Sequence, residues 1–265
     1  MLNVQVISKF QNTSIEIEQS LGGGTAMLTQ GQNPEWHQLW EERGRAVGRA
    51  LGETVPPGQV VPFTWKQFIL PGACGLTFKP IANRAHYMYM TLGLTQPSER
   101  GADALEWEFA IQTKEYAQWP NQVLFDLLTY WLDQKSKIRR GLLLPLTFFM
   151  NAGNELCAGL TNRLTHLEFV GAIRGLYLWD DSEHLRFTVS SGEFGLMAAV
   201  AVTDDEIQMA QGTTPPHLLL LLKRMQIGQL SDPSRMSVMT MSGADTEWER
   251  IRAMSHDQAV RELDG

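Results

Sequence analysis

The sequence predicts a mixed β-sheet with helices packed on its faces, which is an α/β or α+β fold. Two kinds of pattern carry this prediction. Runs such as HYMYM at residues 86–90 and LEWEFAIQT at residues 105–113 alternate in character, as strands with two differently solvated faces do. The stretch at residues 119–134, WPNQVLFDLLTYWLDQ, instead repeats apolar residues at helical spacing. Because segments of both kinds follow one another, we expect helices to pack on a sheet.

The N-terminal part combines an arm, a helix and several strands. The first 33 residues hold two short alternating runs and a glycine-rich turn, which indicate a strand pair or an irregular arm. Asn33 followed by Pro34 predicts an N-capped helix that ends at Gly52. After a turn at residues 56–58 come four strand-like runs, VVPFTWKQFIL, CGLTFKP, HYMYMTLGL and LEWEFAIQT.

The C-terminal part begins with the helix at residues 119–134. Strand-like runs follow, namely LLLPLTFF, THLEFVG, RGLYLWDD and two further runs joined at residues 190–192. The stretch HLLLLLKRM predicts a buried helix, because five leucines are too few to span a membrane. Two short charged helices end the chain, and Ser255 and Gln258 have capping-box spacing at the start of the second. We divide the chain into an N-terminal arm and helix (1–59), a central domain (60–235) and a C-terminal helical tail (236–265).

Composition limits the classes of partner. A chain of 265 residues can bury a sizeable core, as one large domain or two small ones. Its formal net charge of −7 disfavours nucleic acid, because phosphate binding depends on clustered Lys and Arg, and would suit a basic partner. The N-terminus has no signal pattern and no apolar run is long enough for a membrane helix. We therefore expect a cytoplasmic protein that does not contact membranes.

Three consecutive carboxylates, Asp204, Asp205 and Glu206, are either an acid/base cluster or the start of a helix. Thr203 and Glu206 have the spacing of a capping box, in which each side chain bonds the backbone N–H of the other residue. The two aspartates then lie in the first helical turn, where the helix dipole favours anions by roughly 0.3–1 kcal/mol each. Helix capping accounts for all three carboxylates, and we favour it.

Two other groups could carry enzyme chemistry. Asp180, Asp181 and His184 could bind a metal, although a polar cluster between two strand-like runs is more typical of a solvated hairpin loop. Cys157 could act as a nucleophile if a distant His approached it, but a buried, reduced thiol is the simpler interpretation for Cys157 and Cys74. The sequence contains no nucleophile elbow, phosphate-binding loop or dinucleotide-binding motif. We predict no metal and no cofactor, and a hydrolase-type enzyme remains the less favoured alternative.

Four stretches occur in a known order and spacing. They are HYMYMTLGL, LEWEFAIQT, WPNQVLFDLLTYWL and SSGEFGLMAAVAVTDDEIQMAQ, and the leucine-rich HLLLLLKRM follows them. In this order, from about residue 60 to residue 234, the chain resembles the Suppressor of fused (Sufu) domain family. It departs from the family pattern where Trp107 replaces a Phe, and where His86 stands in place of paired histidines.

The resemblance implies a non-enzymatic mixed α/β domain that binds another protein. The animal member sequesters a transcription factor by holding an extended peptide, and bacterial members are proposed as immunity proteins that neutralise secreted toxins. The chain lacks the animal protein's long second domain, so it resembles the bacterial single-domain type. We therefore expect a protein partner, a cognate toxin or effector domain. A homodimer through the tryptophan-bearing strands or the C-terminal helices is compatible with this role.

Candidate binding residues follow from the same resemblance. Glu108 corresponds to a partner-contacting position of the family. Trp107, Tyr87 and Tyr89 lie on the same two strand-like runs, and we predict that they also contact the partner. An extended peptide could add to the edge of the LEWEFAIQT strand through backbone hydrogen bonds.

Overall fold

The computed structural model describes residues 34–51, 59–65, 68–80, 84–95, 107–134, 139–146, 172–181, 184–190, 192–211 and 213–265. The strands in these ranges are β1 (Gln59–Trp65), β2 (Phe68–Phe78), β3 (Tyr87–Leu92), β4 (Trp107–Thr113), β5 (Leu143–Pro145), β6 (Gly175–Asp180), β7 (Arg186–Val189) and β8 (Gly192–Val202). The helices are α1 (Pro34–Ala50), α3 (Trp119–Gln134), α6 (Asp204–Ala210), α7 (Pro215–Arg224), α8 (Ala244–Arg252) and α9 (His256–Asp264), with a short 3-10 helix, η3 (Val238–Thr240).

The described strands form one mixed sheet in the order β1-β2-β3-β4-β8-β6-β5. Neighbours pair antiparallel except β4 and β8, which run parallel. Strand β8 pairs with β4 along one edge, while β6 and then β7 pair with successive parts of its other edge. It therefore connects all parts of the sheet.

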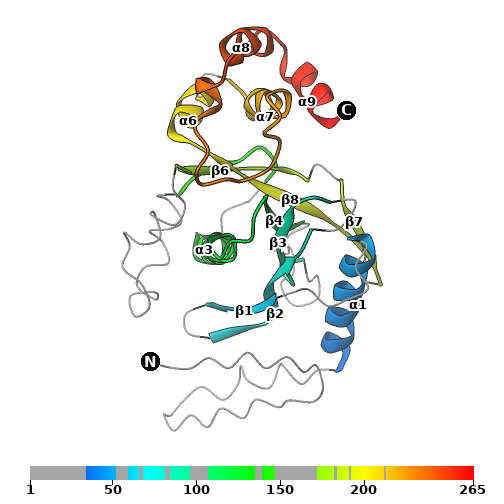
Figure 1. Cartoon of the computed structure of the whole chain (residues 1–265). Helices are drawn as coiled ribbons and strands as arrows, with labels where there is room; N and C mark the ends of the chain where they lie inside the picture. The colour runs from blue at the N-terminus through cyan, green and yellow to red at the C-terminus, as the bar shows by residue number, and fades with distance from the viewer. Residues whose placement is uncertain are drawn as a thin grey trace, which may run out of the picture.

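Helices cover both faces of the sheet (Figure 1). Helix α3 packs on one face, where its Val123, Leu124 and Leu127 join a buried cluster with Phe109 and Ile111 of β4. On the other face, α1 covers the region of β2, β3 and β7. The helices α6 to α9 gather over β6 and β8 and form a third buried cluster with alternate residues of β8.

The predicted fold class is confirmed: the molecule is a mixed sheet with helices on its faces. Helix α3 has the predicted bounds, and α1, α7, α8 and α9 form where the sequence indicates. The two runs joined at residues 190–192 are β7 and β8. The predicted run at residues 60–70 is instead two strands, β1 and β2, which pair as a hairpin. The predicted arm at residues 1–33 lies outside the described residues.

Helices α8 and α9 contribute Trp248, Ile251 and Ala259 to the core built on β8. The domain boundaries at residues 59 and 235 stay a prediction. Within the part of the chain described here, no helix is both long enough and apolar enough to cross a bilayer.

Candidate functional site

Glu108, the first predicted partner contact, lies inside the molecule with 0% of its surface exposed. Its Oε1 atom accepts hydrogen bonds from the backbone N–H groups of Gly93, Leu94 and Thr95 at 2.9, 3.0 and 3.2 Å. The hydroxyl groups of Thr95 and Thr91 donate to Oε1 at 2.9 Å and to Oε2 at 2.7 Å. Its contact with a partner remains a prediction, whereas the geometry assigns the carboxylate an internal role: it holds the turn that follows β3.

Arg43 extends this network to helix α1. Its guanidinium donates to the Thr95 hydroxyl at 2.7 Å and to the Thr95 carbonyl at 2.8 Å, and it lies 5.3 Å from the ring centroid of Phe194. Burial lowers the pKa of Arg43 from its ordinary value, and the nearby Glu108 carboxylate opposes that shift. The network thus ties α1 to the turn after β3.

The tyrosine surface, which we define as Tyr87 and Tyr116, lies at one end of β3, next to Tyr89. Tyr89 is fully buried, and its hydroxyl accepts a hydrogen bond from the Ala117 N–H at 2.7 Å. Tyr87 is partly buried and meets Tyr116 edge to face, with ring centroids 5.9 Å apart. Tyr116, which the sequence analysis did not select, is 52% exposed. Tyr87 and Tyr116 therefore present aromatic surface to solvent.

Trp107 lies far from these tyrosines, because Tyr87 pairs with Thr113 at the opposite end of β4. Six residues of strand separate the two ends, roughly 20 Å at about 3.3 Å per residue. The four predicted residues are thus two separate surface positions, Tyr87 and Trp107, and two buried positions, Tyr89 and Glu108. They do not form one binding site in this structure.

The predicted addition of a peptide strand to β4 is wrong. Ala110, at the middle of β4, pairs with Met90 of β3 on one side and with Ala198 of β8 on the other. Both edges of the strand are occupied, so its backbone has no free edge to offer. The pattern LEWEFAIQT predicted the strand correctly but contained no information about its neighbours.

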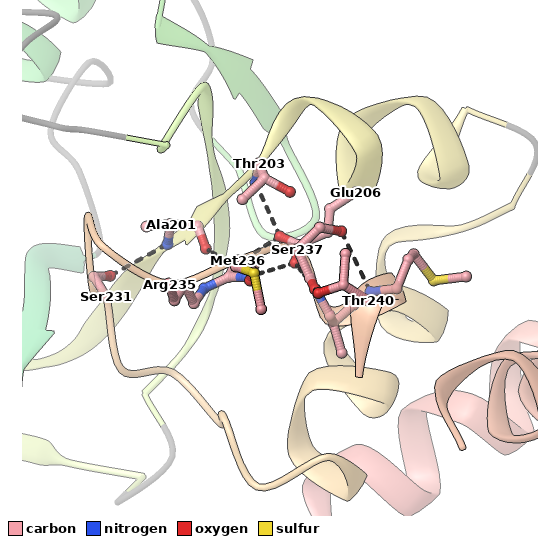
Figure 2. Close-up of polar contacts among 10 residues, drawn as sticks. Ala201, Thr203, Glu206, Ser231, Arg235, Met236, Ser237 and Thr240 are labelled. Carbon is pink, nitrogen blue, oxygen red and sulfur yellow. Dashed lines mark hydrogen bonds and ion pairs between the residues drawn. The ribbon is translucent and has the colours of Figure 1, made fainter. Parts of the chain in front are cut away.

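The acidic run at residues 204–206 begins helix α6, as predicted, and Thr203 and Glu206 take up the capping-box arrangement. The Glu206 carboxylate makes its half of the box, whereas the Thr203 hydroxyl has no hydrogen-bond partner among the described residues. Glu206 is fully buried. Figure 2 shows the Arg235 guanidinium directed at its carboxylate, with the two Nη atoms 2.5 and 2.6 Å from the carboxylate oxygens. The N–H groups of Thr203 and Val238 also donate to the carboxylate, at 2.9 and 2.8 Å. All of these contacts are structural, so the capping interpretation holds and the carboxylate acts as an anchor.

This anchor holds a segment with exposed methionines. Met236 is 72% exposed and Met241 is 39% exposed, while Met239 between them is partly buried. The Ser237 hydroxyl accepts from the Met239 N–H at 3.3 Å, and its carbonyl accepts from the Thr240 hydroxyl at 2.8 Å. We call Met236, Met239 and Met241 the methionine surface. Its signal in the sequence is the spacing MSVMTM, and none of these methionines was among the predicted binding residues.

The residues considered for a metal site, Asp180, Asp181 and His184, have separate environments. Asp180 pairs with Arg140, its Oδ2 atom lying 3.3 Å from Nε. Asp181 is buried and accepts a hydrogen bond from the Gln112 amide at 2.8 Å, whereas His184 is exposed. Asp180 ends β6, and Asp181 and His184 lie in the connection from β6 to β7. Among the described residues, no three His, Cys, Asp or Glu side chains are placed to hold a metal ion. Cys157 lies outside the described residues.

Comparisons with known proteins agree with this architecture. A family model described as Suppressor of fused protein (SUFU) matches residues 72–236. A chain in the crystal structure of the Sufu–Fu complex has a TM-score of 0.57 at 16% identity, over 82% of this chain and 98% of that chain. Drosophila Suppressor of Fused has a TM-score of 0.55 at 14% identity, over 80% of this chain and 54% of its own. No curated protein sequence matched the chain.

A bacterial structure is also similar. A SUFU homolog from Neisseria gonorrhoeae FA 1090 has a TM-score of 0.53 at 12% identity, over 79% of this chain and all of its own. At these identities the structural likeness shows the fold alone. The family model, however, covers well over half of the sequence and includes β3, β4, α3 and β8, the elements that carry the resemblance. The chain therefore belongs to the Suppressor of fused (SUFU) family.

Proposed function

We propose that this chain is a non-enzymatic domain that binds another protein. Membership of the SUFU family supports the proposal, and one structural neighbour is a chain from a complex of Sufu with Fu. The observation that carries it here is the methionine surface. Met236 lies largely in solvent and Met241 is partly exposed, on a segment that a buried ion pair fixes in place.

Rigid presentation matters for the energetics of binding. Methionine is apolar and adapts its shape, so it suits contact with another protein, and burying an exposed side chain yields free energy from the hydrophobic effect. The segment is already ordered by Arg235 and by the turn at Ser237, so little backbone entropy remains to be lost on binding. These residues are consequently suited to contact a partner.

Charge specifies the partner further. Asp204 and Asp205 are exposed in the first turn of α6, which contacts η3. Asp232, shortly before Arg235 in the chain, is also exposed. Together with the net charge of −7, these carboxylates favour a basic protein. We propose that the partner is a cognate toxin and that the chain is an immunity protein acting in a bacterial cytoplasm.

The test is a pull-down of the tagged protein with the product of the adjacent open reading frame, followed by a growth assay with both expressed. We expect binding, rescue of growth and an association rate that falls with added salt. Binding without rescue would replace immunity by a regulatory, sequestering role. If neither occurs, the toxin proposal is rejected.

Paired variants locate the surface. Met236→Ser combined with Met241→Ser should weaken partner binding about tenfold or more, because interface energy concentrates in a few side chains. Tyr116→Ser is the matched control, since it removes an exposed apolar side chain from the tyrosine surface. If Tyr116→Ser weakens binding and the double methionine variant does not, the interface lies at Tyr87 and Tyr116 instead.

A further inference from the structure

Three adjacent strands build a second, separate feature around Gly195. This residue of β8 pairs with Trp107 of β4 on one side and with Arg186 of β7 on the other. The Arg186 guanidinium carbon lies 4.4 Å from the centroid of the Trp107 ring, which is cation–π distance. Trp107 is partly buried and Arg186 is exposed, so the stacked pair lies at the molecular surface.

Gly195 makes this arrangement possible. A Cβ atom built at this position would collide with both the Trp107 ring and the Arg186 guanidinium. The indole therefore lies directly over the glycine backbone, and the guanidinium lies beside it on the same face of the sheet. Paired strands fix the backbone of all three residues, and stacking on Trp107 places the guanidinium in the structure without a ligand.

Arg186 differs from the other stacked arginines because its guanidinium donates to none of the described residues. The described residues contain four arginines over aromatic rings, namely Arg43, Arg84, Arg140 and Arg186. The first three donate to oxygen atoms of Thr95, Lys79 and Asp264, respectively. Arg186 has no hydrogen bond or ion pair with any described residue. Glu193, two residues from Gly195 on β8, accepts a long hydrogen bond from the Thr188 hydroxyl at 3.4 Å.

We infer that Arg186, stacked on Trp107, is a binding site for a carboxylate of an acidic segment of another protein. Stacking occupies one face of the guanidinium and leaves its N–H edge free, and that edge matches the two oxygens of a carboxylate. A lone guanidinium suits a single negative charge, whereas phosphorylated segments are usually held by clusters of arginines. The indole edge adds an apolar contact for the neighbouring residue of the segment.

This site is independent of the methionine surface and of the proposed toxin partner. The methionine surface suits a basic protein, while Arg186 is an exposed cation on an acidic chain and selects the opposite charge. The two proposals can therefore fail separately: the pull-down above tests the first, and a selection with displayed peptides tests the second.

The probe is a phage-displayed library of random 12-residue peptides, selected on the full chain. We expect enrichment of Asp and Glu among the selected peptides. The strongest binder is then synthesised and its affinity measured by fluorescence anisotropy. Arg186→Gln should weaken binding about tenfold or more. Arg186→Lys, which keeps the charge but loses the planar fork, should fall between Arg186→Gln and the wild type.

Arg261→Gln on α9 is the matched control, since it removes one exposed positive charge elsewhere, and it should leave affinity within about twofold. A peptide with its acidic residue changed to Gln tests the same contact without altering the protein. On the wild-type protein, this Gln peptide should lose as much affinity as the original peptide loses on the Arg186→Gln variant. On the Arg186→Gln variant, the two peptides should bind equally. Selected peptides without acidic enrichment, or equal affinity for wild type and Arg186→Gln, would overturn the inference.

Discussion

Two fully buried glutamates stabilise two regions of this domain in different ways. Glu108, in the middle of the sheet, accepts five hydrogen bonds from neutral N–H and O–H groups of residues 91–95, and the Arg43 guanidinium donates to Thr95. Glu206, at the start of α6, is paired directly with a guanidinium from a distant segment. The first carboxylate shapes a nearby turn, whereas the second joins two parts of the chain. A third buried carboxylate, Asp126, has neither arrangement.

The largest effect is expected from breaking the ion pair. Arg235→Ala leaves the Glu206 charge buried without its counter-ion, so the free energy of unfolding should fall by about 3–5 kcal/mol. Urea denaturation measures the change. Arg250→Ala, which removes an exposed pair with Glu247, is the control and should cost less than about 1 kcal/mol. Equal losses for the two variants would contradict the anchoring role of Glu206.

Asp126 should show an effect of the opposite sign. It lies buried in α3 with one amide donor, Gln122, at 3.1 Å, and burial raises its pKa to about 7. Because the folded state prefers the protonated acid, this residue's contribution to stability falls as pH rises from about 4 to about 7. Asp126→Asn removes that loss.

The gain in unfolding free energy for Asp126→Asn should therefore be small at pH 4 and on the order of 4 kcal/mol at pH 8. Thermal or urea unfolding across this pH range measures it. A gain that does not depend on pH would show that the carboxylate does not titrate as burial predicts.

The smallest of the three effects is expected at Glu108. Glu108→Gln keeps an oxygen acceptor for the backbone N–H groups but replaces the carboxylate oxygen near Thr91 by an NH₂ group, so stability should fall by about 1–2 kcal/mol. Amide hydrogen exchange at residues 93–95 should quicken more than exchange in α3. Unchanged exchange at these residues would show that the carboxylate does not hold the turn.

Local patterns predicted much of the fold. The apolar spacing of residues 119–134 gave the bounds of α3, and Thr203 and Glu206 marked the start of α6, because helix periodicity and capping involve residues three or four positions apart. The strands β3 and β4 were predicted in the same way. Their neighbours were not, since alternation shows two faces of a strand but not what pairs with its edges. The strand-edge hypothesis for β4 failed for this reason.

The candidate sites depend on contacts that no short pattern contains. Arg235 is 29 positions from Glu206, and Arg43 is 52 positions from Thr95. Trp107 was selected from the sequence, but its partner Arg186 lies on another strand, and only the shared neighbour Gly195 brings them together. The burial of Glu108 could not be predicted for the same reason. Its carboxylate oxygens accept hydrogen bonds from a turn that lies earlier in the chain.

The parallel pairing of β4 with β8 also constrains how the protein is made. Trp107 cannot pair with Gly195 until Gly195 has been synthesised. During that interval β1 to β4 can form hairpins, while the edge of β4 that later pairs with β8 stays unpaired. Contacts so distant in the chain form slowly, and an unpaired apolar strand edge is open to aggregation. Strand β8 therefore protects this edge of β4 from aggregation once it has been synthesised. Chains truncated before residue 192 should leave the edge exposed and require a chaperone.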